Sequence, residues 1–342
     1  MSDPTVAHPS VTHDGWLPEQ WYPLIESRRL RRKPVAVQRL GERLALWRDA
    51  SGAVVAMRDR CPHRGVALSR GSVKGDRIEC PYHGFQFDTS GDCQLMPCEG
   101  EQARIPAGMT VDTYAVREQH GLVWIYWGER VEELPEIPWF DEISGRRGGA
   151  STSKSWPINF VRTIESNFDI HHTPFVHGSV MPGLGARLDP FHVEVNGSHI
   201  ATRGELRKPG ADSGLAFRME FKMPCVTLIE LTPKVVFVIA DCPIDEHSTW
   251  RWARYYVDYL PIPGIHQALS WLFLQVDWAI FQFPQDLKVM ETQEPKLPDR
   301  HIDRLVNADG GTAAYLRLRR QLWAEAEARR NAGTSSSLKQ VS

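Results

Sequence analysis

Hydrophobic and polar residues alternate in short stretches over the first third of the chain. Residues 35–40, 43–47 and 54–57 follow this period of two and are separated by turns that contain glycine. Such alternation is typical of β-strands with one buried face. Residues 111–116 and 122–127 are further strands of the same kind. The chain therefore opens with what we expect to be an all-β domain.

The second half of the chain combines longer strands with helices. Alternation at 191–195, 199–202, 216–221, 226–231, 235–239 and 249–257 predicts an antiparallel sheet. Residues 313–330 form an amphipathic helix, and residues 265–283 have two apolar stripes at helical spacing. One stripe holds Ile265, Leu269, Leu272, Val276, Ile280 and Phe283, and the other holds Trp271, Leu274, Trp278 and Phe281. A helix that is apolar on two faces is normally buried in a core. The wall of a pocket for a lipophilic substrate, or a subunit contact, is the alternative for the second stripe.

These elements predict an α+β protein. We expect an N-terminal arm at 1–18, a β domain at 19–130, a linker rich in proline and glycine at 131–150, a second domain at 151–330 with an antiparallel sheet and covering helices, and a tail at 331–342.

Composition narrows the class of partner. The 342 residues carry a formal net charge of -2, which gives no sign of nucleic-acid binding. The N-terminus has no signal peptide, and no run of 18 apolar residues predicts a transmembrane segment, so we expect a cytoplasmic protein. A basic run at Arg28, Arg29, Arg31, Arg32 and Lys33 is either a solvated loop or a docking patch for an acidic electron donor.

Two similar loops within the β domain carry cysteine and histidine. The first reads Cys61-Pro-His63-Arg-Gly and the second Cys80-Pro-Tyr-His83-Gly. Zinc also accepts two cysteines and two histidines, but classical zinc fingers place both cysteines first. The alternating order matches a Rieske [2Fe-2S] cluster, in which two cysteines bind one iron and two histidines the other. Cys93 and Cys98 have no matching histidine loop and are interpreted as ordinary thiols.

A second candidate site lies between Arg162 and His177. At helical spacing Glu165, Asp169 and His172 share one face. His177 lies five residues further, roughly 140° round a straight helix, but Pro174 lets the chain bend so that both imidazoles converge. Two histidines and a carboxylate are the ligands of many non-haem iron sites. A solvated helix face with structural histidines is the alternative, and His171 is a rival to His172.

The two motifs together resemble the Rieske non-haem iron oxygenases, in their terminal oxygenase component. The likeness runs from about Trp16 to Trp323 and is greatest to members that hydroxylate or demethylate. It identifies residues 19–130 as the Rieske domain and residues 151–330 as the catalytic domain with a mononuclear iron. Many relatives carry asparagine three residues before the bridging aspartate, where this chain has Ser166 followed by Asn167.

The resemblance also implies the rest of the site. Asp286 supplies the carboxylate that joins His172 and His177 on the iron, with Glu291 and Glu294 as alternatives. Asp169 binds His172 and connects it to a histidine of the cluster. That cluster belongs to the neighbouring subunit of a head-to-tail homotrimer.

We therefore expect an oxygenase that receives electrons through its Rieske cluster and uses a mononuclear Fe(II) to activate O2. The chain has no nucleotide or flavin motif, so the donor is a separate NAD(P)H-dependent reductase or ferredoxin. The expected reaction is hydroxylation or oxidative demethylation of a small, largely hydrophobic organic substrate. The alternatives are a Rieske-type electron carrier with a non-catalytic binding domain and a zinc-stabilised binding protein.

Overall fold

The computed structural model describes residues 15–129, 131, 133–146, 149–259, 262, 264–298 and 303–338. It divides the chain into two compact units, one ending at Pro135 and the other beginning at Glu136. Residues 1–14 of the expected arm and 339–342 of the expected tail lie outside the described residues. The expected fold class, a β-rich N-terminal domain and a second domain of antiparallel sheet and helices, is confirmed.

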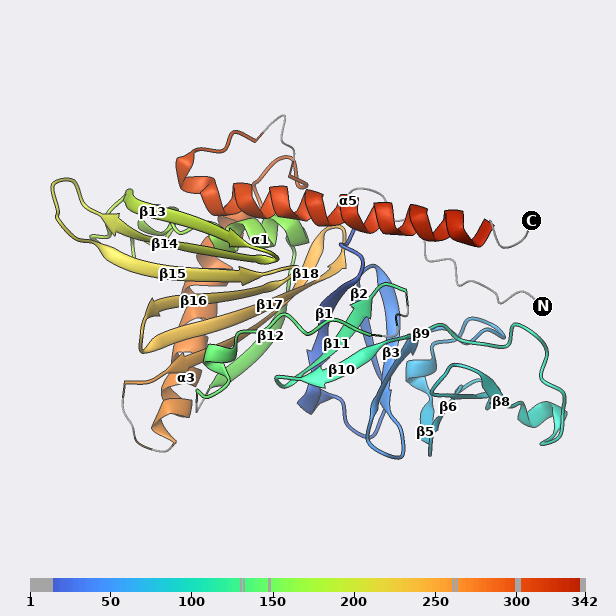
Figure 1. Cartoon of the computed structure of the whole chain (residues 1–342). Helices are drawn as coiled ribbons and strands as arrows, with labels where there is room; N and C mark the ends of the chain where they lie inside the picture. The colour runs from blue at the N-terminus through green and yellow to red at the C-terminus, as the bar shows by residue number, and fades with distance from the viewer. Residues whose placement is uncertain are drawn as a thin grey trace. The chain divides into compact units, whose positions relative to one another are not determined.

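The first unit is built from three small antiparallel sheets (Figure 1). The first sheet has the order β1 (Gln20–Glu26), β11 (Leu122–Trp127), β10 (Val116–Gln119). The second has the order β2 (Val35–Arg39), β3 (Glu42–Arg48), β4 (Val54–Arg58), β9 (Thr113–Tyr114). The third has the order β5 (Ser72–Lys74), β6 (Arg77–Glu79), β7 (Gln86–Asp88), β8 (Cys93–Leu95). Short 3-10 helices occupy Ser27–Arg29, Leu68–Arg70 and Pro97–Glu99.

Apolar side chains of the second and third sheets form one core. Trp47, Met57 and Phe87 are fully enclosed in it, and Cys61 and Cys80 belong to the same cluster of buried residues. The loops that carry these cysteines are therefore fixed by the packing beneath them.

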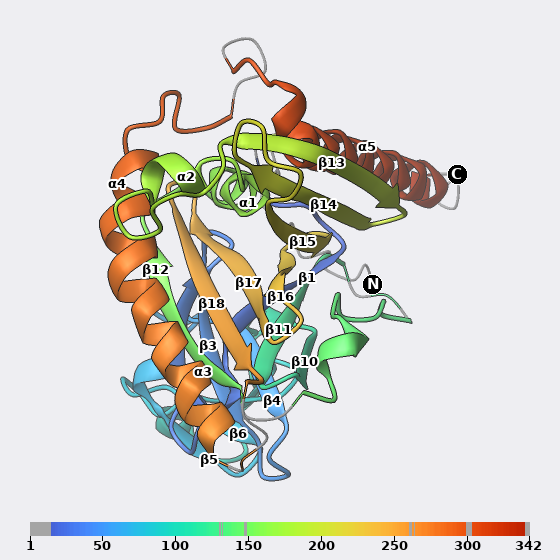
Figure 2. The same ribbon diagram turned by 90° about the vertical axis from the view of Figure 1, so that its left-hand side faces the viewer.

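A seven-stranded antiparallel sheet dominates the second unit (Figure 2). Its order is β12 (Ala150–Trp156), β18 (Ser248–Val257), β17 (Val235–Asp245), β16 (Val226–Thr232), β15 (Leu215–Lys222), β14 (His199–Arg207), β13 (Arg187–Asn196). The last strand, β13, contains Pro190 and a register shift between Leu188 and Phe191.

Helices surround this sheet. They are α1 (Phe160–Phe168), α2 (Thr173–Val176), α3 (Ile265–Val276), α4 (Leu287–Met290) and α5 (Gly310–Leu338), with 3-10 helices at Asp141–Ile143 and Asn307–Asp309. A π-helix, η5 (Asp277–Asp286), joins α3 to α4 without a break. The resulting rod packs through α3 along β18 and β12, while α5 packs on β13, β14 and α1 (Figure 2).

The expected burial of residues 265–283 is wrong for most of the first stripe and for part of the second. The buried side chains are Ser270, Leu274, Trp278 and Gln282, which recur every four residues. Leu272, Val276 and Ile280 of the first stripe are exposed, and so is Trp271 of the second. Only one narrow face of the rod meets the sheet, where Leu274 and Trp278 pack in one core cluster with side chains of β12, β17 and β18.

Candidate metal centres

The two cysteine-histidine loops of the first unit have the same backbone design. In each, the N–H of cysteine donates to a carbonyl five residues later, from Cys61 to Val66 and from Cys80 to Phe85, both at 2.8 Å. A glycine N–H then donates back to the cysteine carbonyl, at 2.8 Å for Gly65 and 3.0 Å for Gly84. Both glycines have φ above +70°, which L-residues rarely adopt. Glycine is therefore required to close each loop.

The cysteines of these loops point inward and the histidines outward. Cys61 and Cys80 are buried, whereas His63 is exposed and His83 partly so. The two imidazole centroids lie 4.7 Å apart, and the His63 ring stacks on Phe85 at 4.8 Å. Burial and the neighbouring Cys80 thiol raise the pKa of Cys61 to about 11. Paired sulfurs inside and paired imidazoles at the surface fit the two unlike halves of a Rieske cluster.

The histidines of the second unit follow a helix that ends earlier than the sequence predicts. Asn159 caps the start of α1 by accepting from the N–H groups of Val161 and Arg162. The helix ends at Phe168, and Asp169 is extended with φ -85° and ψ 95°, so no single helix face runs through to His172. Asp169 Oδ1 instead accepts from the backbone N–H of His172 at 3.0 Å. The chain turns there, before the bend expected at Pro174, which occupies the first turn of α2.

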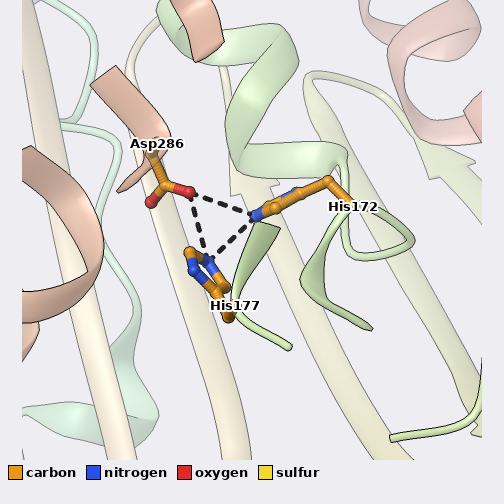
Figure 3. A group of neighbouring side chains, drawn as sticks. All are labelled: His172, His177 and Asp286. Atoms are coloured by element: carbon orange, nitrogen blue, oxygen red, sulfur yellow. Dashed lines mark hydrogen bonds and ion pairs between the residues drawn. The ribbon is translucent and has the colours of Figure 1, made fainter. Parts of the chain in front are cut away.

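His172, His177 and Asp286 converge on one point (Figure 3). His177 Nε2 lies 3.1 Å from Asp286 Oδ1, and His172 Nε2 lies 3.5 Å from the same oxygen. The two Nε2 atoms are 3.3 Å apart. Ligands at right angles on a metal with bonds of about 2.1 Å are separated by roughly 3 Å. Asp286 Oδ1 is buried and accepts no well-directed hydrogen bond from the part of the chain that the structure describes, so the three atoms fit a divalent metal ion.

Electrostatics at this point favour positive charge. Burial acts to lower the pKa of His172, but Asp169 and Asp286 outweigh it and raise the pKa to about 10. Burial also opposes the rise in the pKa of His177, which Asp286 and Gln285 cause. The two imidazoles in turn hold the pKa of Asp286 below its ordinary value, although burial acts to raise it.

Two side chains orient the histidines from behind. Asp169 Oδ1 lies 3.4 Å from Nδ1 of His172. Nδ1 of His177 is 2.7 Å from Gln285 Oε1, and a proton on that nitrogen leaves Nε2 free as a ligand. Sequence reasoning identified Asp169 but missed Gln285, for which the only signal was its position next to Asp286.

The rival residues lie elsewhere. His171 faces Asp169 at 3.1 Å and Asp309 at 3.5 Å, away from the three converging atoms. Glu291 and Glu294 are exposed and are not part of the group.

A cavity of about 480 Å³ opens beside the three converging side chains. Its walls are strands β15 to β18 on one side and α1, α2 and η5 on the other. Most of the lining is apolar, including Phe217, Ile229, Phe237, Ile239 and Phe281. This size is typical of sites for small organic ligands.

A buried ion pair supports the floor of the cavity. Arg251 Nε donates to Asp241 Oδ1 at 2.9 Å, and its Nη2 donates to Asn167 Oδ1 at 2.7 Å. Asn167 Nδ2 in turn donates to Asp241 and to Thr227. The amide next to Ser166 therefore ties α1 to the sheet, which the sequence alone did not reveal.

Comparisons with known proteins show which domain the first part of the chain contains and which proteins the chain is similar to. A family model described as the Rieske [2Fe-2S] domain matches residues 20–115, a span that includes both cysteine-histidine loops. Methylxanthine N1-demethylase NdmA of Pseudomonas putida is 29% identical over 309 residues, covering 84% of this chain and 82% of that protein. The 3-chlorobenzoate-3,4-dioxygenase oxygenase subunit of Comamonas testosteroni is 35% identical over 166 residues, covering 48% of this chain but only 38% of that protein.

The similarity extends to the three-dimensional structure. NdmA of Pseudomonas putida CBB5 with caffeine superposes with a TM-score of 0.70 and 26% identity, covering 90% of this chain and 92% of that one. The chain belongs to the Rieske non-haem iron oxygenases. Dicamba monooxygenase bound to dicamba shares the fold of this Rieske oxygenase, with a TM-score of 0.76 and 23% identity over 92% of this chain and 99% of that one.

The Rieske oxygenase is thus an oxidoreductase with an N-terminal [2Fe-2S] domain, as the sequence predicted. None of the helices that the structure describes is long and apolar enough to cross a membrane.

Proposed function

We propose that this chain is a terminal oxygenase that hydroxylates or oxidatively demethylates a small, largely hydrophobic organic compound. The observation that carries the proposal is the convergence of His172, His177 and Asp286 within 3.1 to 3.5 Å, on the wall of a mostly apolar cavity. Those three residues would hold a mononuclear Fe(II), which supplies the activation of O2 when bound.

The protein's own residues prepare this reaction in three ways. Asp169 and Gln285 hold the two imidazoles with Nε2 toward Asp286. The rings of Phe281 and His177 meet edge to face with centroids 5.0 Å apart, which restricts rotation of the imidazole. The apolar lining excludes water from the reacting carbon and favours a substrate of matching polarity.

The [2Fe-2S] domain would receive electrons from a separate protein. Cys61, Cys80, His63 and His83 would hold the cluster, and the two histidines lie at the surface where a donor can approach. We propose an NAD(P)H-dependent reductase or a ferredoxin as that donor. We also propose a homotrimer in which the cluster of one subunit serves the iron of the next through Asp169.

Metal analysis and three single-residue variants test the proposal. The purified protein should be coloured and contain about three irons and two labile sulfides per chain. Cys61→Ser should abolish the colour, whereas His172→Ala should keep the colour and lose the product. Asp169→Asn should retain both centres and normal reduction by dithionite, yet lose nearly all turnover. Stoichiometric zinc without labile sulfide would refute the proposal.

A further inference from the structure

The cavity holds one carboxylate that the proposed function does not use. Asp277 is the first residue of η5 and lines the same cavity as His172, His177 and Asp286. Its Oδ2 accepts from the hydroxyl of Tyr255 at 2.6 Å and from Nε2 of Gln282 at 2.9 Å. Its Oδ1 accepts no hydrogen bond from any residue that the structure describes, and the side chain is only partly buried. One oxygen is therefore available to a ligand.

An apolar row of side chains runs across the sheet from Tyr255, which binds Asp277. Strand register places Met219, Ile229, Phe237 and Tyr255 in one row across β15, β16, β17 and β18. The rings of Phe237 and Tyr255 stack with centroids 4.7 Å apart and planes 4° from parallel. The hydroxyl of Tyr255 already donates to Asp277. A ligand that displaces water from the part of the cavity beside Asp277 must replace the hydrogen bonds that water makes to Oδ1. A carboxylate oxygen left unpaired beside apolar groups costs free energy.

Arg251, whose positive charge acts to lower the pKa of Asp277, does not take that place. Arg251 binds Asp241 through Nε and Nη2, Asn167 through Nη2 and Gln282 through Nη1, so its donors point at other groups. Burial and the neighbouring carboxylate of Asp286 raise the pKa of Asp277 to about 6, against the hydrogen bonds from Tyr255 and Gln282. At pH 7.5 and above the group is an ionised acceptor.

We propose that Asp277 Oδ1 accepts a hydrogen bond from an N–H or O–H group of the substrate and so selects apolar substrates that carry such a donor away from the reacting carbon. Asp277 and Asp286 are nine residues apart on one continuous rod, at most about 13.5 Å along its axis. A molecule of one or two rings can therefore contact Asp277 and still reach the site beside Asp286. This inference rests on the proposed function for the position of the reacting carbon, but the donor site itself does not depend on turnover.

A purely structural role for Asp277 is the rival explanation, since its Oδ2 joins η5 to β18 through Tyr255. Asp277→Asn separates the two. The amide oxygen of asparagine can accept both existing hydrogen bonds, while its NH2 group takes the place of Oδ1 and donates. The variant therefore keeps the structural link and reverses the polarity that a ligand meets.

The test measures affinity for three anisoles of similar size that differ at the para position. They are 4-methoxyaniline, which has a donor, 4-methylanisole, which has neither donor nor acceptor there, and 4-methoxybenzaldehyde, which has only an acceptor. Dissociation constants are measured by calorimetry at pH 8 on the metal-loaded enzyme without O2. The wild type should bind the aniline at least about tenfold more tightly than 4-methylanisole, and the aldehyde least well.

Asp277→Asn should lose the tenfold preference and bind the aldehyde more tightly than the aniline. Should this variant not fold, Asp277→Ser should likewise lose the preference. Asp258→Asn is the matched control, because Asp258 binds Arg146 at 2.9 Å and does not line the cavity; its affinities should equal those of the wild type.

An order of affinities that Asp277→Asn leaves unchanged would overturn the inference. So would a wild type that does not prefer the aniline, or that fails to bind it at millimolar concentration. The measurement needs neither electrons nor product. Absence of oxygenation would therefore refute the proposed function without altering the order of affinities.

Discussion

A single contact determines which nitrogen of His177 faces the candidate metal. Nδ1 lies 2.7 Å from Gln285 Oε1, and an amide oxygen can only accept, so Nδ1 carries the proton. Replacing Gln285 by leucine removes that partner and frees the imidazole to change tautomer. We expect the affinity for iron to fall about 10- to 100-fold, as is usual when a partner of a metal-bound histidine is lost.

The measurement is the rate of iron loss to a chelator, followed against the unchanged absorbance of the cluster. Gln275→Leu, at an exposed position of α3, is the matched control and should lose iron at the wild-type rate. Equal rates for both variants would remove Gln285 from the site.

Asp277 should also make stability depend on pH. Its pKa in the folded protein is about 6, above the ordinary 3.8, chiefly because of burial. The folded state therefore binds the proton of Asp277 more tightly than the unfolded state does. This binding adds to the free energy of unfolding; the contribution is complete below about pH 4 and is lost as the pH rises through 6. Relative to the wild type, Asp277→Asn should gain about 1.4 kcal/mol in free energy of unfolding between pH 5 and pH 8.

Urea unfolding of both proteins at pH 5, 6, 7 and 8 measures that difference. Asp258→Asn reports the effect of removing a carboxylate outside the cavity. A constant difference between Asp277→Asn and the wild type across this range would contradict the raised pKa.

Residue spacing predicted some of these positions and could not predict others. Cys61, His63, Cys80 and His83 repeat one short loop pattern, and such local patterns are readable from sequence. Asp286 was reached only through the resemblance to a family. Gln285 gave no signal beyond its position next to Asp286, and Asp277 gave none, because their roles depend on which way a side chain leaves an irregular helix.

That irregular helix is the main feature at the scale of elements. Pro284 has no N–H group and its ring would clash with the carbonyl of Ile280 in an α-helix. In η5 the hydrogen bonds reach one residue further, which accommodates the proline. Residues four to five apart then share a face, and Asp277, Gln282 and Asp286 all reach the cavity. A regular helix of 3.6 residues per turn, as the sequence predicts, would have Trp271 and Phe281 in one apolar stripe.

Two tryptophans of this rod should contribute very differently to the stability of the fold. Trp278 is 3% exposed and packs in the core against Phe283, whereas Trp271 is 57% exposed. Trp278→Ala should cost about 3–5 kcal/mol in free energy of unfolding because it leaves a cavity. Trp271→Ala should cost less than about 0.5 kcal/mol in the unassembled chain.

Thermal and urea unfolding of the two alanine variants check this pair. The comparison holds residue type and helix constant, so only burial differs. Similar losses for both would show that the outer face of α3 is covered in the assembled protein.

At the scale of the whole molecule, the proposed trimer predicts complementation between two inactive variants. Cys61→Ser lacks a cluster but keeps the iron site, and His172→Ala has the reverse defect. If electrons cross from one subunit to the next, trimers assembled from both chains contain working pairs. We expect co-expressed chains with different affinity tags, purified through both, to regain a substantial fraction of wild-type turnover.

Mixed trimers that stay inactive would mean that each chain uses its own cluster. A tandem purification of two wild-type chains is the control for the tags.

Sequence predicted the division into a β-rich first part and a sheet-and-helix second part because hydrophobic periods are local. It could not predict the order of strands in the seven-stranded sheet, which long-range register decides.

The outermost strand of that sheet bears on how the protein behaves when concentrated. An open sheet edge has unpaired N–H and C=O groups that can pair with a strand of another molecule, and such pairing commonly initiates aggregation. In β13, Pro190 cannot donate, and the register shift between Leu188 and Phe191 bends the strand. Arg187 and Asp189, paired at 2.6 Å, add charge along the same stretch. The chain thus carries its own protection against strand-to-strand association, and replacing Pro190 would expose it to fibre formation.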